Sequence, residues 1–170
     1  MTTANDLLTG GFDHVRDTVQ QAVEGLSEDQ LAHRPDAEAN SVAWLVWHLT
    51  RVQDDHVADV AGGEQLWTAG GWVERFRLPF DVETIGYGQS ADEVGQVRAT
   101  PELLAGYQDA VHRSTVDYVS TLADGDYERV VDERWDPPVT LAVRLLSVLN
   151  DTLQHAGQAS YVRGLIDRQG

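Results

Sequence analysis

Apolar side chains recur at every third or fourth position in four long stretches of the sequence, residues 5–24, 41–60, 101–122 and 139–167. This period matches the turn of an α-helix, so each stretch is predicted to form an amphipathic helix. The pattern is clearest in the first stretch, whose apolar positions are Leu7, Leu8, Phe12, Val15, Val19, Ala22 and Val23. The N-terminal half of the second stretch is apolar nearly all round, which indicates a helix in the protein interior.

Capping signals stand at the starts of two of these helices. Asn40 or Ser41 is placed to cap the second helix, and Thr100 followed by Pro101 is a typical start for the third. Four long helices joined by connections of unequal length predict an all-α fold. We expect a four-helix bundle formed by a single domain over residues 1–170.

Two segments between the helices break the pattern. Residues 64–100 are rich in aromatic residues and glycine, then polar, and predict a long loop between the second and third helices. Connections of this length are usually a lid, a binding loop or a dimer contact. The segment DGDYERVVDERWDPPVT alternates weakly between polar and apolar positions, which predicts a small hairpin or an extended crossover before the last helix.

Composition narrows the classes of function. The formal net charge of -16 disfavours nucleic acid or an anionic membrane as a partner, because both need a basic surface. The chain has no cysteine, so any nucleophilic sulfur must arrive with a substrate. It shows neither a secretory leader nor the roughly 18 uninterrupted apolar residues of a membrane span, so we expect a soluble cytoplasmic protein.

Three polar residues in apolar surroundings carry the candidate chemistry. Asp151 and His155 lie four residues apart, a helical rise of about 6 Å that two side chains can close onto one ion. His48 projects inward from the second helix, whereas Asp55 lies about 10.5 Å further along and cannot share an ion with it. If the second and fourth helices pack together, two imidazoles and one carboxylate converge, a set that suits zinc, nickel or ferrous iron. The competing interpretation is a hydrogen bond between Asp151 and His155, with His48 as an ordinary core residue.

The arrangement LSEDQLAHRPDAEANSVAWLVWHL, followed by a long loop and LNDTLQHAGQASYVRGL, resembles the DinB/YfiT-like superfamily, specifically its actinobacterial mycothiol-transferase branch. The resemblance implies a four-helix bundle that binds a divalent metal through one histidine on the second helix and an H-x-x-x-H pair on the fourth. His48 matches the first ligand and His155 the last, while Asp151 takes the place of the middle histidine. Carboxylate oxygen also binds zinc, so ligation by this set remains expected.

The same resemblance implies a metal-dependent S-transferase. The metal, for which zinc is the preferred ion, would activate mycothiol or a related small thiol as a thiolate for attack on an electrophile, a reaction used in detoxification. A homodimer is also implied. Two alternatives stay open: a thiol-dependent isomerase or metal-dependent hydrolase of the same superfamily, and a noncatalytic stress-response bundle.

Five further residues are candidate substrate contacts. Trp44 and Trp47 flank His48, and Trp72 with Arg75 on the long loop could hold a sugar or carboxylate by stacking and paired hydrogen bonds. Gln158 could support a metal ligand from the next helical turn. The competing interpretations are core tryptophans, a surface arginine and a surface glutamine. The stretch Gln53-Asp54-Asp55 is interpreted as a solvated patch, and no pairing is predicted for His14, His33, His56 and His112.

Overall fold

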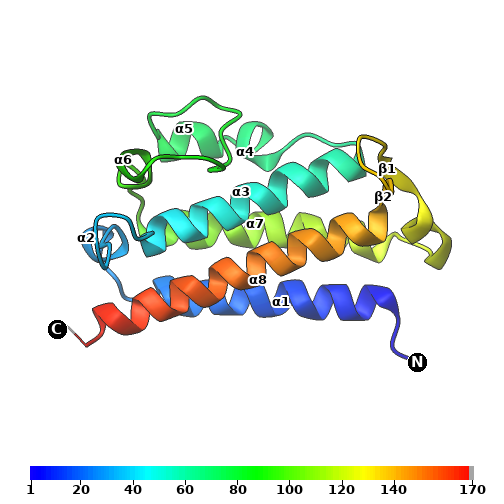
Figure 1. The fold of residues 1–170 in the computed structure, drawn as a ribbon. Helices are drawn as coiled ribbons and strands as arrows, with labels where there is room; N and C mark the ends of the chain where they lie inside the picture. Colours follow the sequence, from blue (N-terminus) through cyan, green and yellow to red (C-terminus); the bar gives the residue numbers. More distant parts are fainter. Residues whose placement is uncertain (169–170) are drawn as a thin grey trace.

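A computed structural model describes residues 1–168, and four long helices dominate it (Figure 1). They are α1 (Ala4–Val23), α3 (Val42–Ala61), α7 (Pro101–Ser120) and α8 (Leu141–Ile166). The helices lie side by side, and both α7 and α8 contact α1 and α3. The predicted all-α class is confirmed, and each long helix begins within two residues of its predicted start.

Side-chain caps explain where the long helices begin. The Ser41 hydroxyl accepts a hydrogen bond from the Trp44 backbone N–H, and the Thr100 hydroxyl accepts one from Leu103. Such caps satisfy backbone N–H groups that have no partner within the first helical turn. Pro101 is the first residue of α7, as its sequence context predicts.

All four long helices contribute to one hydrophobic core. Every residue of α3 from Val42 to Asp54 is buried, which confirms that this helix is interior. A smaller cluster lies where α3 ends and α8 begins, formed by Val57, Val60, Tyr127, Leu141 and Leu145. No helix within residues 1–168 combines the length and hydropathy that crossing a bilayer requires.

The predicted long loop contains three short helices, α4 (Leu66–Ala69), α5 (Trp72–Phe76) and α6 (Ala91–Val94). They cover α3 on one side of the molecule, and a further one-turn helix, α2 (Glu28–Leu31), follows α1 (Figure 1). The segment is held against the bundle by aromatic residues. Three of them are buried in the core: Trp67, Trp72 and Phe76.

Buried polar groups of α3 hold the connection between α3 and α7 in place. The interpretation of Gln53 and Asp54 as part of a solvated patch is wrong. Gln53 and Asp54 are buried rather than solvated. The Asp54 carboxylate accepts hydrogen bonds from two backbone N–H groups at the start of α4 and from the Tyr107 hydroxyl. Arg51, with no exposed surface, lies 3.9 Å from Asp54 and donates to the carbonyl oxygen of Thr84. These partners satisfy groups that burial would otherwise destabilise.

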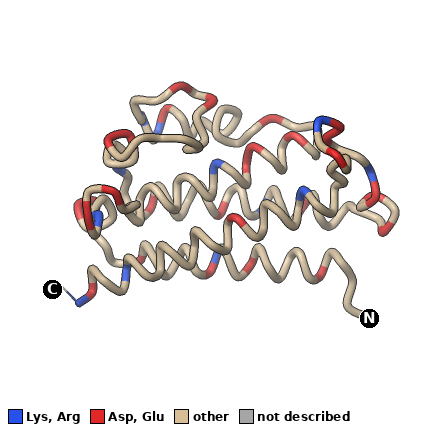
Figure 2. The backbone as a smooth tube through the Cα atoms, viewed as in Figure 1, with Lys and Arg blue, Asp and Glu red and all other residues tan. Residues whose placement is uncertain are grey.

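The segment before α8 forms the predicted hairpin. A short 3-10 helix (Asp124–Glu128) leads into β1 (Val130–Asp132), which pairs antiparallel with β2 (Val139–Thr140). The second strand runs directly into α8, so the hairpin turn is held beside the first turns of that helix. Acidic positions are spread along the whole backbone and outnumber basic ones, in keeping with the net charge of -16 (Figure 2).

Candidate metal centre and adjoining pocket

The packing of α3 on α8 brings His48 close to Asp151 and His155. One potential ligand atom from each residue lies within 4.8 Å of the other two. Ligands of a tetrahedral zinc ion lie roughly 3.4 Å apart, a value that follows from zinc–ligand distances near 2.1 Å. The three side chains are therefore within a small rotation of a shared ion, as the helical spacing predicts.

The orientation of His48 is fixed by the long connection. Its Nδ1 atom donates to the carbonyl oxygen of Ile85 at 2.5 Å, so Nε2 carries the free lone pair. Histidines that bind metals usually donate their other ring N–H in this way. Burial lowers the pKa of His48, partly opposed by the Ile85 hydrogen bond, and favours the neutral ring. Trp44 stacks on this imidazole, with ring centroids 4.5 Å apart.

The alternative of a hydrogen bond between Asp151 and His155 does not describe the structure. His155 Nε2 lies 3.9 Å from Asp151 Oδ1, beyond hydrogen-bonding distance. Asp151 Oδ2 and His155 Nδ1 are buried and find no hydrogen-bond partner among the described residues. Buried polar atoms are rarely left unpaired, because they lose their hydration. Two imidazoles and a carboxylate in this state fit a divalent cation.

Residues 85–87 complete the surroundings of His48, and the sequence analysis missed them. Gly86 has φ +106°, and a Cβ atom placed there would lie 2.4 Å from His48 Nδ1. Only glycine allows the backbone to come this close. The neighbouring Tyr87 meets the His48 ring edge-on, with centroids 5.4 Å apart. The two glycines of the stretch IGYG are the only signal for this approach in the sequence.

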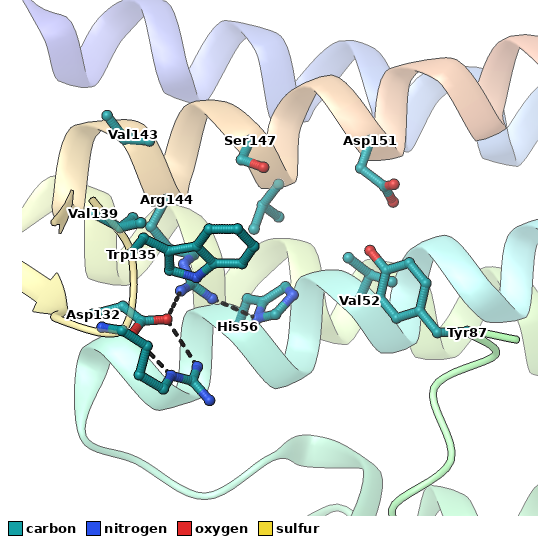
Figure 3. A pocket seen from close by; sticks show the side chains of 12 residues that line it. Val52, His56, Tyr87, Asp132, Trp135, Val139, Val143, Arg144, Ser147 and Asp151 are labelled. Atoms are coloured by element: carbon teal, nitrogen blue, oxygen red, sulfur yellow. Dashed lines mark hydrogen bonds and ion pairs between the residues drawn. The ribbon is translucent and has the colours of Figure 1, made fainter. Parts of the chain in front are cut away.

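A pocket of about 350 Å³ adjoins the three-residue cluster (Figure 3). Tyr87 and Asp151 line it beside the cluster, and Asp132 with Trp135 line it at the hairpin. Its wall also includes an apolar strip from α3, β2 and α8: Val52, Val139, Val143 and Val148. The pocket is thus lined by α3, by the long connection at Tyr87, and by the hairpin together with α8, which are distant from one another in the sequence.

A network of ion pairs builds the hairpin end of this pocket. Asp132 accepts hydrogen bonds from Nε and Nη2 of Arg134 and from Arg144, and the Arg134 bonds hold the pKa of Asp132 well below its usual range. Arg144 also contacts Nδ1 of His56 at 3.0 Å. Burial lowers the pKa of His56, which favours its neutral form. The sequence predicts no pairing for His56, but the structure places it in the wall of this pocket.

The structure brings one of the five candidate substrate residues to the cluster. Trp44 stacks on His48 and lies 6.3 Å, centroid to centroid, from His155. Trp47 instead packs in the core, where its described aromatic neighbours are Trp67 and Phe80. The reason is helical geometry, because consecutive residues point to different faces of α3.

The other three candidates lie apart from these contacts. Trp72 is buried against Tyr107, and the Arg75 guanidinium lies 3.9 Å from the centre of the Trp72 ring. The two residues, one turn apart on α5, thus form a cation–π contact with each other. Gln158 is exposed on α8, and its side chain makes no hydrogen bond to the described residues.

Comparisons with known proteins identify a family and a similar fold. The sequence profile of the family described as Mycothiol-S-transferase matches residues 7–168. A crystal structure described as the conserved protein of locus from Enterococcus faecalis superposes with a TM-score of 0.91, at 28% identity over 98% of each chain. A search among curated proteins gives no significant match. Because the profile covers nearly the whole sequence, the chain belongs to the mycothiol-S-transferase family, within the DinB/YfiT-like group.

Proposed function

We propose that the protein is a metal-dependent thiol S-transferase built on a single four-helix bundle. His48, Asp151 and His155 would hold one divalent cation, with zinc preferred and nickel or ferrous iron as alternatives. Mycothiol is the expected thiol, given the family to which the chain belongs. The observation that carries the proposal is the convergence of these three side chains around unpartnered buried atoms.

The chain's own residues position the reactants. A cation bound at the three side chains would lower the pKa of a thiol, and so supply thiolate at neutral pH. The Ile85 carbonyl keeps His48 in one tautomer, and Trp44 excludes water from one face of its ring. The thiol approaches from the pocket side, where Tyr87 and Asp151 are accessible.

The overall reaction balances without any other reactant. The sulfur lone pair forms a bond to the electrophilic carbon, and the leaving group departs with its own electron pair. The thiol proton goes to solvent or to the leaving group. The chain has no cysteine, so the transferred sulfur belongs to the substrate alone. Orientation in the pocket supplies the remaining acceleration.

Metal content is the first test. Protein purified without an affinity tag is expected to contain about one metal ion per chain by elemental analysis. The variant His155→Ala should lose the metal and the thiol-dependent consumption of 1-chloro-2,4-dinitrobenzene, while its circular dichroism spectrum is unchanged. The control is His14→Ala, which removes an exposed imidazole from α1. Full metal content in the His155 variant would contradict the ligand set.

The same experiments separate the alternatives. Turnover of an ester without added thiol would indicate a hydrolase, and isomerisation without a stable thiol adduct would indicate an isomerase. A protein that binds no metal and consumes no electrophile would be the noncatalytic bundle. The homodimer implied by the family resemblance stays a prediction, which sedimentation velocity tests directly.

A further inference from the structure

Three side chains on one face of α3 donate hydrogen bonds to the long connection. They belong to Trp44, His48 and Arg51, whose spacing of four and three residues places them in one row along the helix. Their acceptors follow the opposite order in the sequence, at Gln89, Ile85 and Thr84. Residues 84–89 therefore run antiparallel to this row of α3.

The contact at the far end of the row has a side chain as its acceptor. Gln89 Oε1 accepts a hydrogen bond from the Trp44 indole N–H at 2.7 Å. We propose that Gln89 is a positioning residue for the candidate metal centre, which it reaches through Trp44. The inference rests on the proposed function, because it concerns the same metal ligands. It assigns a role to a residue that does not itself contact the ion.

Trp44 contacts both candidate imidazole ligands. Its ring stacks on His48, with centroids 4.5 Å apart and an angle of 17° between the planes. The same ring meets His155 edge-on, at 6.3 Å and 62°. Both distances lie in the range where aromatic rings attract each other. Because the two imidazoles are themselves only 4.8 Å apart, a rotation of this one indole would displace both ligands together.

The pairing of Trp44 differs from that of the other buried indoles of the core. Trp47 and Trp67 are also buried, but their Nε1 atoms find no hydrogen-bond partner among residues 1–168. Buried indole N–H groups usually have an acceptor. In the described part of the chain, the indole beside the candidate ligands has one, whereas these two do not. Burial of the donor alone therefore does not account for the contact with Gln89.

Gln89 is itself held in place by its neighbours. It immediately precedes α6, whose first turn is closed by a capping box between Ser90 and Glu93. Four residues before Gln89, the Ile85 carbonyl is bound to His48. The backbone is thus fixed on both sides, so less side-chain freedom is left to be lost when the hydrogen bond forms. Since an indole N–H can only donate, the amide oxygen of Gln89 must face it.

Zinc affinity tests the inference without catalysis. Metal-free, full-length protein is titrated with zinc in competition with a chelator. Gln89→Leu removes the acceptor at similar size and is expected to weaken zinc binding about tenfold, the lower end of the range for outer partners of metal ligands. The matched control is Gln96→Leu, on the same connection, where the exposed side chain donates only to the Asp92 carbonyl. Equal zinc affinities of these two variants, both folded by circular dichroism, would overturn the inference.

A double-mutant cycle tests whether Gln89 acts through Trp44. Trp44→Phe keeps an aromatic ring but removes the indole N–H, so there is no donor left for Gln89. In that background Gln89→Leu should cause no further loss of zinc affinity. A second tenfold loss there would show that Gln89 acts by another route, and would overturn the assignment.

Nuclear magnetic resonance of the metal-free protein separates this inference from the proposed function. The imidazole resonances of His48 and His155 should shift in Gln89→Leu and stay unchanged in Gln96→Leu. Such a shift in a protein that binds no zinc would support the positioning role and refute the metal centre. Zinc binding of unchanged affinity in Gln89→Leu, with unchanged imidazole resonances, would support the metal centre and refute the positioning role.

Discussion

Replacing Gly86 by alanine tests whether the long connection positions the candidate metal ligand. The new Cβ atom would lie 2.4 Å from His48 Nδ1, so the two must separate by about 1 Å to reach an ordinary contact. His48 is buried and already stacked on Trp44, so the ring cannot move away freely. The backbone at Gly86, with φ +106°, also disfavours any side chain.

The expected loss follows from these two effects. A left-handed backbone costs a residue other than glycine about 1–3 kcal/mol. Loss of the hydrogen bond between Ile85 and His48 adds about 0.5–1.5 kcal/mol. For a total near 3 kcal/mol, the melting temperature should fall by about 6–12 °C in a chain of this size. Misplacing a metal-binding imidazole through its supporting partner should weaken zinc affinity about 10–100-fold.

The assay is a zinc titration in competition with a chelator, together with thermal melts of metal-free protein. Gly88→Ala is the matched control, since Gly88 also has positive φ, at +72°, but open space where its Cβ would stand. Both variants should lose stability from backbone strain, and only the Gly86 variant should lose zinc affinity. Equal zinc affinities of the two variants would refute the reasoning.

Three further predictions concern stability. Arg51→Met should lower the free energy of unfolding in urea by about 3 kcal/mol, because it leaves the buried Asp54 without its cation, and a loss below about 1 kcal/mol would contradict this. Since the pKa of Asp132 is lowered on folding, its stabilisation is present above about pH 4 and is lost as the pH falls further. Asp132→Asn should therefore destabilise more at pH 7 than at pH 3, where part of the stabilisation is already lost, and equal losses at both would refute the linkage. Thr100→Ala should cost about 1 kcal/mol in thermal melts by removing the cap on Leu103 N–H, and an unchanged melt would show that the cap is dispensable.

The parts of the fold that follow local rules could be predicted from the sequence. Helix starts at Ser41 and Thr100 depend on neighbouring residues only, and the placement of Asp151 and His155 on one face of a helix depends on helical rise. The inward direction of His48 follows from its apolar neighbours. To predict that His48 meets Asp151 and His155, one assumption was needed, namely that the second and fourth long helices pack together.

The missed residues depend on contacts between distant segments. Ile85 contacts His48 at a sequence separation of 37 residues, and Arg144 contacts His56 at a separation of 88. A periodic pattern along the sequence cannot indicate contacts of this kind. Arg75 is the opposite case. Its stacking on Trp72 is a contact one turn away on α5, which residue spacing alone indicates as readily as a substrate contact.

His48 lies about a hundred residues before the other two candidate ligands, and this has a consequence for biosynthesis. A ribosome that has translated the hairpin has made His48 but neither Asp151 nor His155. A growing polypeptide, or a proteolytic fragment without α8, would thus offer only one of the three candidate ligands and would bind the proposed ion poorly. Loading of the proposed ion would accordingly wait until the last helix has docked, when the surrounding walls are also in place.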